Sequence, residues 1–172
     1  VLGLRDEIDT GKLSYLGIED GNLIIAKQDN YALIAESNFN KQHFMDGLER
    51  QGGVKSIFRF REYTFALVGA VRTEDNCAYA SIINLTNQKL AIQFPCVPGD
   101  ETDLNVVGGG SVVINNGATL LMALGAPETN SAKIRALAQD PNSPYGKILK
   151  IDLIGDSYTH EVYSSGHRNP QS

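Results

Sequence analysis

The stretch CAYASIINLTNQKLAIQF, residues 77–94, sets the pattern of the whole chain. It consists of two short runs rich in apolar and β-branched residues, separated by the polar residues Thr86, Asn87 and Gln88. Runs of this length and composition, bounded by turn residues, are typical of β-strands. The stretch therefore predicts an antiparallel hairpin made of residues 77–85 and 89–97.

The two cysteines of the chain lie near the ends of this hairpin. A two-residue loop at Thr86 and Asn87 would put Cys77 directly opposite Cys96, close enough for a disulfide. A hairpin register can shift by one residue, so two buried free thiols are the alternative. Two widely spaced cysteines do not make a metal site.

Similar short runs follow one another along the whole sequence. Asp20-Gly21 and Asn116-Gly117 are strong hairpin signals between two pairs of them. Helical signal is confined to residues 41–50, with Asn40 as a candidate N-cap, and to residues 131–138. We therefore expect an all-β protein. The predicted strands are residues 13–19, 22–27, 31–36, 56–61, 64–72, 77–85, 89–97, 111–114, 119–124, 146–153 and 160–163.

A weak internal repeat runs through these strands. Residues 13–27, 54–71 and 110–125 each consist of a strand, a short turn and an apolar strand. Their spacing of about 40 to 55 residues falls in the range of propeller blades. The pattern predicts a β-propeller of four-stranded antiparallel blades; a β-sandwich, which needs fewer strands and no repeat, is the alternative.

The strand number predicts about three blades in a single partial propeller domain, over residues 4–53, 54–104 and 105–172. Known propellers close with about four to eight blades, so three blades leave two open sheet faces. Two copies related by a twofold axis would cover both faces. We therefore expect a homodimer through the open blade ends, three blades plus three giving six.

Composition excludes some classes of function. The chain has 172 residues, 42% hydrophobic and 20% charged, which is typical of a globular protein. A formal net charge of -5 argues against a nucleic-acid or anionic-membrane surface. No apolar run is long enough to cross a bilayer. The chain starts at Val1 without a signal-peptide pattern, and we expect a mature form or a fragment.

Two segments near the end of the chain carry a family resemblance. They are AQDPNSPYGKILKID, residues 138–152, and SGHRNPQ, residues 165–171. In this order they resemble the glucose/sorbosone dehydrogenase family, the soluble aldose sugar dehydrogenases that depend on pyrroloquinoline quinone. The resemblance is concentrated in residues 138–172 and extends more faintly back to Gly108.

The resemblance implies a six-bladed propeller with the quinone over its central channel, of which this chain covers about half. It implies pyrroloquinoline quinone and calcium as cofactors and a small carbohydrate as ligand. It also implies a periplasmic or secreted location, which a Cys77–Cys96 bridge would support.

Arg168 and Asn169 match the pair that contacts the cofactor in this family. A guanidinium fork and an amide suit the carboxylates and ortho-quinone of the cofactor. The alternative is a tight turn between blades, in which both side chains hydrogen-bond to backbone.

The catalytic base of the family is missing. The position of its His falls on Val107, or on Gly108 if the glycines shift by one, and neither residue accepts a proton. The Asp that orients this His is replaced by Ala126. We therefore expect a binding or interaction domain without hydride chemistry. The alternatives are a fragment of an active quinone-dependent dehydrogenase and an unrelated β-rich structural module.

Glu128 and His167 are the candidates for a replacement base, since one follows the Ala126 position and the other adjoins Arg168. His43 and His160 have no motif context, and core or surface roles are expected for them.

Two further patterns resemble ligand sites only superficially. Gly108-Gly109-Gly110 lacks the Lys-Ser/Thr of a phosphate loop and precedes a strand, so a tight turn is expected. Glu101 and Asp103 do not have the spacing of a calcium loop and are expected in a solvated loop.

Overall fold

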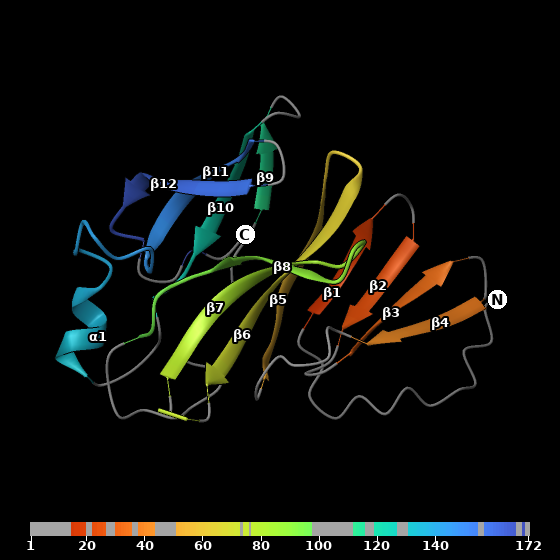
Figure 1. The fold of residues 1–172 in the computed structure, drawn as a ribbon, viewed down its shortest axis with the longest axis horizontal. Helices are drawn as coiled ribbons and strands as arrows, with labels where there is room; N and C mark the ends of the chain where they lie inside the picture. The colour runs from red at the N-terminus through yellow and green to blue at the C-terminus, as the bar shows by residue number, and fades with distance from the viewer. Residues whose placement is uncertain are drawn as a thin grey trace.

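Antiparallel strands form almost all of the described part of the chain, as Figure 1 shows. The computed structural model describes the backbone of residues 15–19, 22–26, 30–35, 38–43, 51–72, 74–75, 77–97, 112–115, 119–126, 131–154, 157–167 and 170. Side chains are described for residues 54–72, 74–75, 77–97, 119–126, 131–152, 157–167 and 170. Within these residues there are three four-stranded sheets and one short helix, which confirms the all-β prediction.

The first sheet is a meander in which each strand pairs with the next. Glu19 pairs with Asn22, which confirms the hairpin predicted between these two strands. The strands are β1 (Tyr15–Glu19), β2 (Asn22–Ala26), β3 (Asn30–Ala35) and β4 (Asn38–His43).

The predicted helix over residues 41–50 is wrong where the structure describes it. Residues 41–43 belong to β4, and Asn40 pairs with Leu33 rather than capping a helix. A strand at this place satisfies backbone groups that β3 would otherwise leave unpaired along its length. Tertiary pairing thus overrides a weak local helix signal; residues 44–50 lie outside the described residues.

The second sheet follows the same order, and its two central strands are buried on both faces. Every residue of β7, and seven consecutive residues of β6, are buried. A strand with one solvated face would alternate between buried and exposed positions, so the centre of this sheet is covered on both sides, while β8 at its edge is mostly exposed. Its strands are β5 (Gln51–Phe60), β6 (Tyr63–Arg72), β7 (Cys77–Asn84) and β8 (Lys89–Gln93).

The turn between β7 and β8 is longer than predicted. The last pair is Asn84 with Lys89, which leaves residues 85–88 in the turn instead of a two-residue loop. The side chain of Asn84 explains the difference, because its Oδ1 accepts from the backbone N–H of Thr86 at 3.0 Å and of Asn87 at 3.3 Å. An Asn side chain that accepts in this way stabilises a turn.

The third sheet is again a meander, with a helix inserted between its second and third strands. Asn115 pairs with Thr119 across the predicted Asn116-Gly117 hairpin. The helix α1 (Ala132–Ala136) confirms the short helix predicted at residues 131–138. The strands are β9 (Val112–Asn115), β10 (Thr119–Leu124), β11 (Lys147–Ile154) and β12 (Ser157–Ser165).

One hydrophobic core lies between the second and third sheets. Phe65 and Leu67 of β6 share it with Met122 of β10, Leu149 of β11 and Ile134 of α1. The sheets follow one another in series: β5 contacts both β1 and β9, and β8 contacts β12. The second sheet therefore lies between the other two, which explains its burial on both faces (Figure 1).

In the described residues, no helix combines the length and the apolar character that a bilayer crossing requires.

Candidate functional site

The two motif segments of the sequence meet at one place in the fold. The backbone N–H of Gly166 donates to the carbonyl of Ala138 at 3.1 Å, and that of His167 donates to the carbonyl of Gly146 at 3.0 Å. The segment that follows β12 is therefore hydrogen-bonded to the connection between α1 and β11. Arg168 and Asn169, which follow directly, lie outside the described residues.

Gly146 makes this close approach feasible. Its φ is 71°, and a Cβ at this position would lie 2.5 Å from the Cβ of Ala138 and 2.6 Å from its Cα. Any other residue would be strained by the backbone angle and would also collide with the backbone of Ala138. The glycine of the Gly-Lys-Ile-Leu motif is thus required by its backbone angle and by its packing against Ala138.

Lys147, the next motif residue, is fully buried and binds backbone carbonyls. Its Nζ donates to the carbonyls of Leu137 and Ala138, both at 2.8 Å, and to that of Tyr145 at 3.2 Å. Two of these carbonyls follow the last turn of α1, where a cation is favoured. Burial lowers the pKa of Lys147, and the carboxylate of Asp140 partly offsets that effect.

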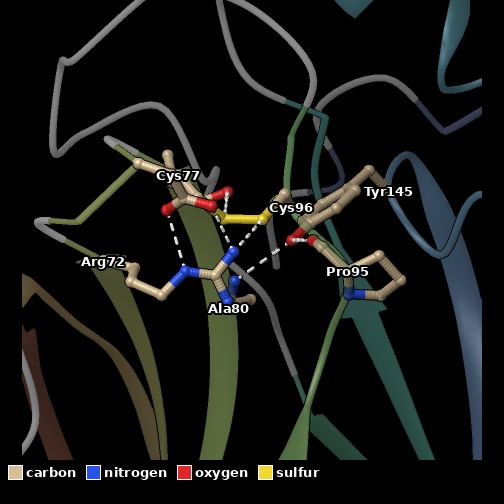
Figure 2. The surroundings of a disulfide bond; sticks show 8 residues. Arg72, Cys77, Ala80, Pro95, Cys96 and Tyr145 are labelled. Atoms are coloured by element: carbon tan, nitrogen blue, oxygen red, sulfur yellow. Dashed lines mark hydrogen bonds and ion pairs between the residues drawn. A yellow bond between two sulfur atoms is a disulfide. The ribbon is translucent and has the colours of Figure 1, made fainter.

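Tyr145 joins the second and third sheets by hydrogen bonds. Its hydroxyl donates to the carbonyl of Pro95 at 2.6 Å and accepts from the N–H of Ala80 at 3.1 Å. Figure 2 shows these contacts beside the cysteines. The side chain is 1% exposed, and burial raises the pKa of its phenol well above the ordinary value.

Cys77 and Cys96 form a disulfide with a Cα–Cα distance of 5.4 Å, so the bridge is present and both thiols are used. The predicted pairing of these residues directly opposite each other is wrong. The register shifts between Ile82 and Ile83, and further along Ala78, not Cys77, faces Val97. The bridge therefore runs diagonally across the hairpin.

Arg72, from the end of β6, lies against this disulfide, as Figure 2 shows. Its Nη2 is 3.4 Å from the Sγ of Cys96. Its Nε donates to Asp75 Oδ1 at 2.8 Å, and Nη2 also pairs with Asp75 Oδ2. This ion pair holds the pKa of the Asp75 carboxyl below its usual range.

The position predicted to have lost the family's Asp is part of the core. Ala126 is 3% exposed and packs with the apolar residues between the second and third sheets. Its methyl group holds no proton and orients no imidazole. Val107, Glu128, the glycines at 108–110, Glu101 and Asp103 lie outside the described residues.

The histidines do not assemble with a carboxylate into a visible acid–base pair in the described part of the chain. The ring of His160 packs edge-on against Phe94, with 5.1 Å between ring centroids, and desolvation lowers its pKa. The Nε2 of His167 lies 2.7 Å from the hydroxyl of Ser164. His43 ends β4, and its side chain is outside the described residues.

The hollow between the two sheets offers no charged group to a ligand. It is lined by aromatic and aliphatic side chains, without carboxylate, imidazole or ammonium groups. Among the described residues no group of three His, Cys, Asp or Glu side chains gathers as a metal site would require. The lining residues are Phe58, Phe60, Phe65, Ile82, Ile92, Leu120, Ile151 and Tyr158.

Sequence reasoning missed three residues that organise this junction: Arg72, Tyr145 and Lys147. In the sequence, Lys147 and Tyr145 stand out only as part of the family motif, although a Lys next to a Gly that follows a helix can bind the C-terminal carbonyls of that helix. Arg72 had no signal, because its neighbour Cys96 is distant in sequence.

Comparison with known proteins gives no relative for this chain. No family model matches it, and no curated protein and no solved structure matches it either. The resemblance to the sugar dehydrogenases therefore rests on the two motif segments.

Proposed function

We propose that this chain forms three blades of a six-bladed β-propeller and acts as a binding or interaction domain without hydride chemistry. The observation that carries the proposal is the serial packing of three four-stranded meanders. Propeller blades are four-stranded meanders that repeat around a channel. The blades proposed over residues 4–53, 54–104 and 105–172 each contain one of these sheets, apart from the start of β5 at Gln51.

The pattern of contacts between sheets supports this architecture over a sandwich. The first strands of the sheets touch, since β5 contacts β1 and β9, and the last strands of two sheets touch, since β8 contacts β12. Radial repetition places equivalent strands of neighbouring blades beside each other. In a two-sheet sandwich each sheet is covered on one face only. The three sheets of this chain differ, because the middle sheet has a neighbour on each side.

The absence of hydride chemistry is supported by the residues at the family's catalytic positions. A general base must hold a proton and reach the substrate. Ala126 is a core methyl group, and Val107 is an aliphatic residue in the sequence. Glycan binding on the propeller, with a small carbohydrate as ligand, needs neither residue and remains within the proposal.

A second candidate is a quinone-dependent sugar dehydrogenase of which this chain is a fragment. It is favoured by the fastening of Gly166 and His167 to Ala138 and Gly146, which fixes the start of the segment that carries Arg168 and Asn169. In that case the guanidinium of Arg168 would pair with the carboxylates of pyrroloquinoline quinone.

Reconstitution with calcium and pyrroloquinoline quinone decides between these functions. The first proposal expects no dye reduction with any aldose. A variant with Arg168→Ala and Asn169→Ala serves as control for turnover by free quinone. Sugar-dependent turnover that this variant abolishes would overturn the non-catalytic proposal.

The proposal includes a homodimer in which two copies close the ring. The face of the third sheet that points away from the core is mixed in character: Leu121 and Ile148 are half-buried, and Lys150 bonds Asp152 at 2.8 Å and Glu161 at 3.0 Å. The half-exposed aliphatic side chains favour the binding of a partner that buries them. The charged side chains on the same face are typical of an interface that forms reversibly.

Light scattering tests this assembly against the chain mass of 18.7 kDa. The expected species has twice this mass, and Leu121→Asp shifts it to the monomer. The surface variant Leu90→Asp, in β8 of the second sheet, should leave the dimer intact. A monodisperse monomer of the unaltered protein at high concentration would rule the closed ring out.

The proposed location is periplasmic or extracellular. The Cys77–Cys96 disulfide supports it, because disulfides persist in oxidising compartments.

A further inference from the structure

The two cysteines of the disulfide differ in their exposure to solvent. Cys96 belongs to an exposed position in the segment after β8, whereas Cys77 is 6% exposed and packs with Ala70 and Tyr79. Thiol–disulfide exchange requires an incoming thiolate to reach one sulfur. Access alone therefore directs attack to the Sγ of Cys96.

A fixed cation lies beside that same sulfur. The guanidinium of Arg72 approaches Cys96 Sγ to 3.4 Å (Figure 2). Its two bonds to Asp75 hold it in place. Guanidinium stays charged at all ordinary pH values and binds carboxylates. The carboxylate of Asp75 offsets this charge at longer range, so an anionic thiol at Cys96 gains from the guanidinium through the N–H donor of Nη2 at close contact.

We propose that Cys96 is a reversible modification site that exchanges with small anionic thiols of the glutathione class. The external thiolate attacks Cys96 Sγ, the Cys77–Cys96 bond breaks, and a mixed disulfide forms on Cys96. Cys77 leaves as a thiolate and takes a proton from water. In reverse, the Cys77 thiolate attacks Cys96 Sγ and expels the external thiol, so each step consumes one disulfide and forms one.

Such a modification would affect the junction between the second and third sheets. Pro95, which directly precedes Cys96, accepts the hydrogen bond from the hydroxyl of Tyr145. A mixed disulfide on Cys96 therefore lies next to a contact that joins the second and third sheets. Exchange at Cys96 should weaken that contact and loosen the fold locally.

A matched pair of single-thiol variants tests the assignment. Cys77→Ser and Cys96→Ser both lack the bridge, and each keeps one thiol. With glutathione disulfide at neutral pH, intact-mass spectrometry should show Cys77→Ser acquiring one glutathionyl group about tenfold faster than Cys96→Ser. Equal rates, or faster modification of Cys96→Ser, would overturn the proposal.

The role of the cation is tested in the Cys77→Ser background. Arg72→Gln should slow the reaction with glutathione disulfide several-fold and should not slow the reaction with cationic cystamine. Arg135→Gln, which alters an exposed residue of α1, is the control and should change neither rate. An Arg72→Gln variant that reacts as fast as its parent with glutathione disulfide contradicts the assignment of Arg72.

The unaltered protein provides a test that does not depend on how the variants fold. It is treated with reduced glutathione, quenched with an alkylating agent and mapped by peptide mass spectrometry. Glutathione on Cys96 with the alkyl group on Cys77 supports the proposal. The opposite distribution, or a bridge that stays intact until the protein unfolds, refutes it.

Discussion

Lys147 shows how a single buried charge can be accommodated without an acidic partner at bonding distance. Its three ammonium protons meet three carbonyl oxygens around the end of α1. Burying a cation is costly unless its donors are satisfied. The side chain therefore serves as a cap at the end of the helix, and its charge has a structural role there.

Replacing Lys147 by Met should lower the free energy of unfolding by about 2 kcal/mol, because buried carbonyls lose their charged donor. The loss of stability is not larger, because the Met variant no longer has to bury a charge. The control is Lys150→Met: this lysine lies in a surface ion-pair network, and its replacement should cost clearly less than that of Lys147. Urea unfolding measures both. Equal losses would contradict the capping role.

Tyr145 should make stability depend on pH in the alkaline range. Burial raises the pKa of its phenol above the ordinary value of about 10, so the fold favours the neutral form. This stabilisation is complete below about pH 10 and is lost as pH rises from there through the higher pKa of the folded state.

The test compares the unaltered protein with Tyr145→Phe. At pH 7 the variant should be less stable by about 1–2 kcal/mol, since the Pro95 carbonyl and Ala80 N–H lose their partner. At pH 11 the difference should shrink by about 1 kcal/mol. Subtracting the two proteins removes the opposite trend from Lys147, whose lowered pKa makes stability rise toward pH 10. A difference that stays constant with pH would exclude titration of Tyr145.

At the scale of elements, two glycines with positive φ allow the cost of backbone strain to be distinguished from the cost of a steric clash. Gly146, before β11, has no room for a Cβ, whereas a Cβ on Gly166, after β12, would have its nearest neighbour at 3.7 Å. Both have φ values that L-residues rarely adopt, 71° and 86°.

Gly146→Ala should therefore destabilise by more than about 3 kcal/mol, and Gly166→Ala by only about 1 kcal/mol, the cost of the backbone angle. Chemical unfolding monitored by circular dichroism gives both values. If the two variants lose the same stability, the overlap with Ala138 is relieved by a shift of the chain, and the close approach is not what requires Gly146.

Most strands could be predicted because their signals are local. The turn pairs Asp20-Gly21 and Asn116-Gly117 placed two hairpins, and apolar runs such as residues 64–72 placed the buried strands. β4 was missed because residues 38–43 are polar and owe their strand conformation to pairing with β3. β12 proved longer than the predicted residues 160–163, since its flanks pair with β11 without an apolar pattern.

The candidate site was less predictable than the fold. The presence of the disulfide could be foreseen as one of two outcomes, but its diagonal course depends on shifts of register that no local pattern signals. The contact of Tyr145 with Pro95 joins residues 50 positions apart. Such contacts follow from the packing of whole sheets, which the sequence does not encode in any single stretch.

At the scale of the whole molecule, the second and third sheets share one core and should unfold together. Leu149, fully buried in β11, packs in the same cluster as Ile82 and Phe94 of the second sheet. A shared core makes the two sheets a single cooperative unit.

Leu149→Ala should lower stability by about 3 kcal/mol. In native-state hydrogen exchange, amide protection should fall by a similar amount in β7 and in β11, although the substitution lies only in β11. Leu90→Ala, at a position that is 45% exposed, is the control and should leave both strands protected. A loss confined to the third sheet would show that the two sheets open independently.

The disulfide also has a mechanical consequence. Cys77 and Cys96 are 19 positions apart and enclose the whole β7–β8 hairpin. When the chain is pulled from its ends, this covalent loop cannot extend, so tension passes across the sulfurs and bypasses the hairpin. At about 3.5 Å per residue, reduction should release roughly 60 Å of hidden contour length in a single-molecule stretching trace. The bridge thus sets how far this protein can be drawn out under load.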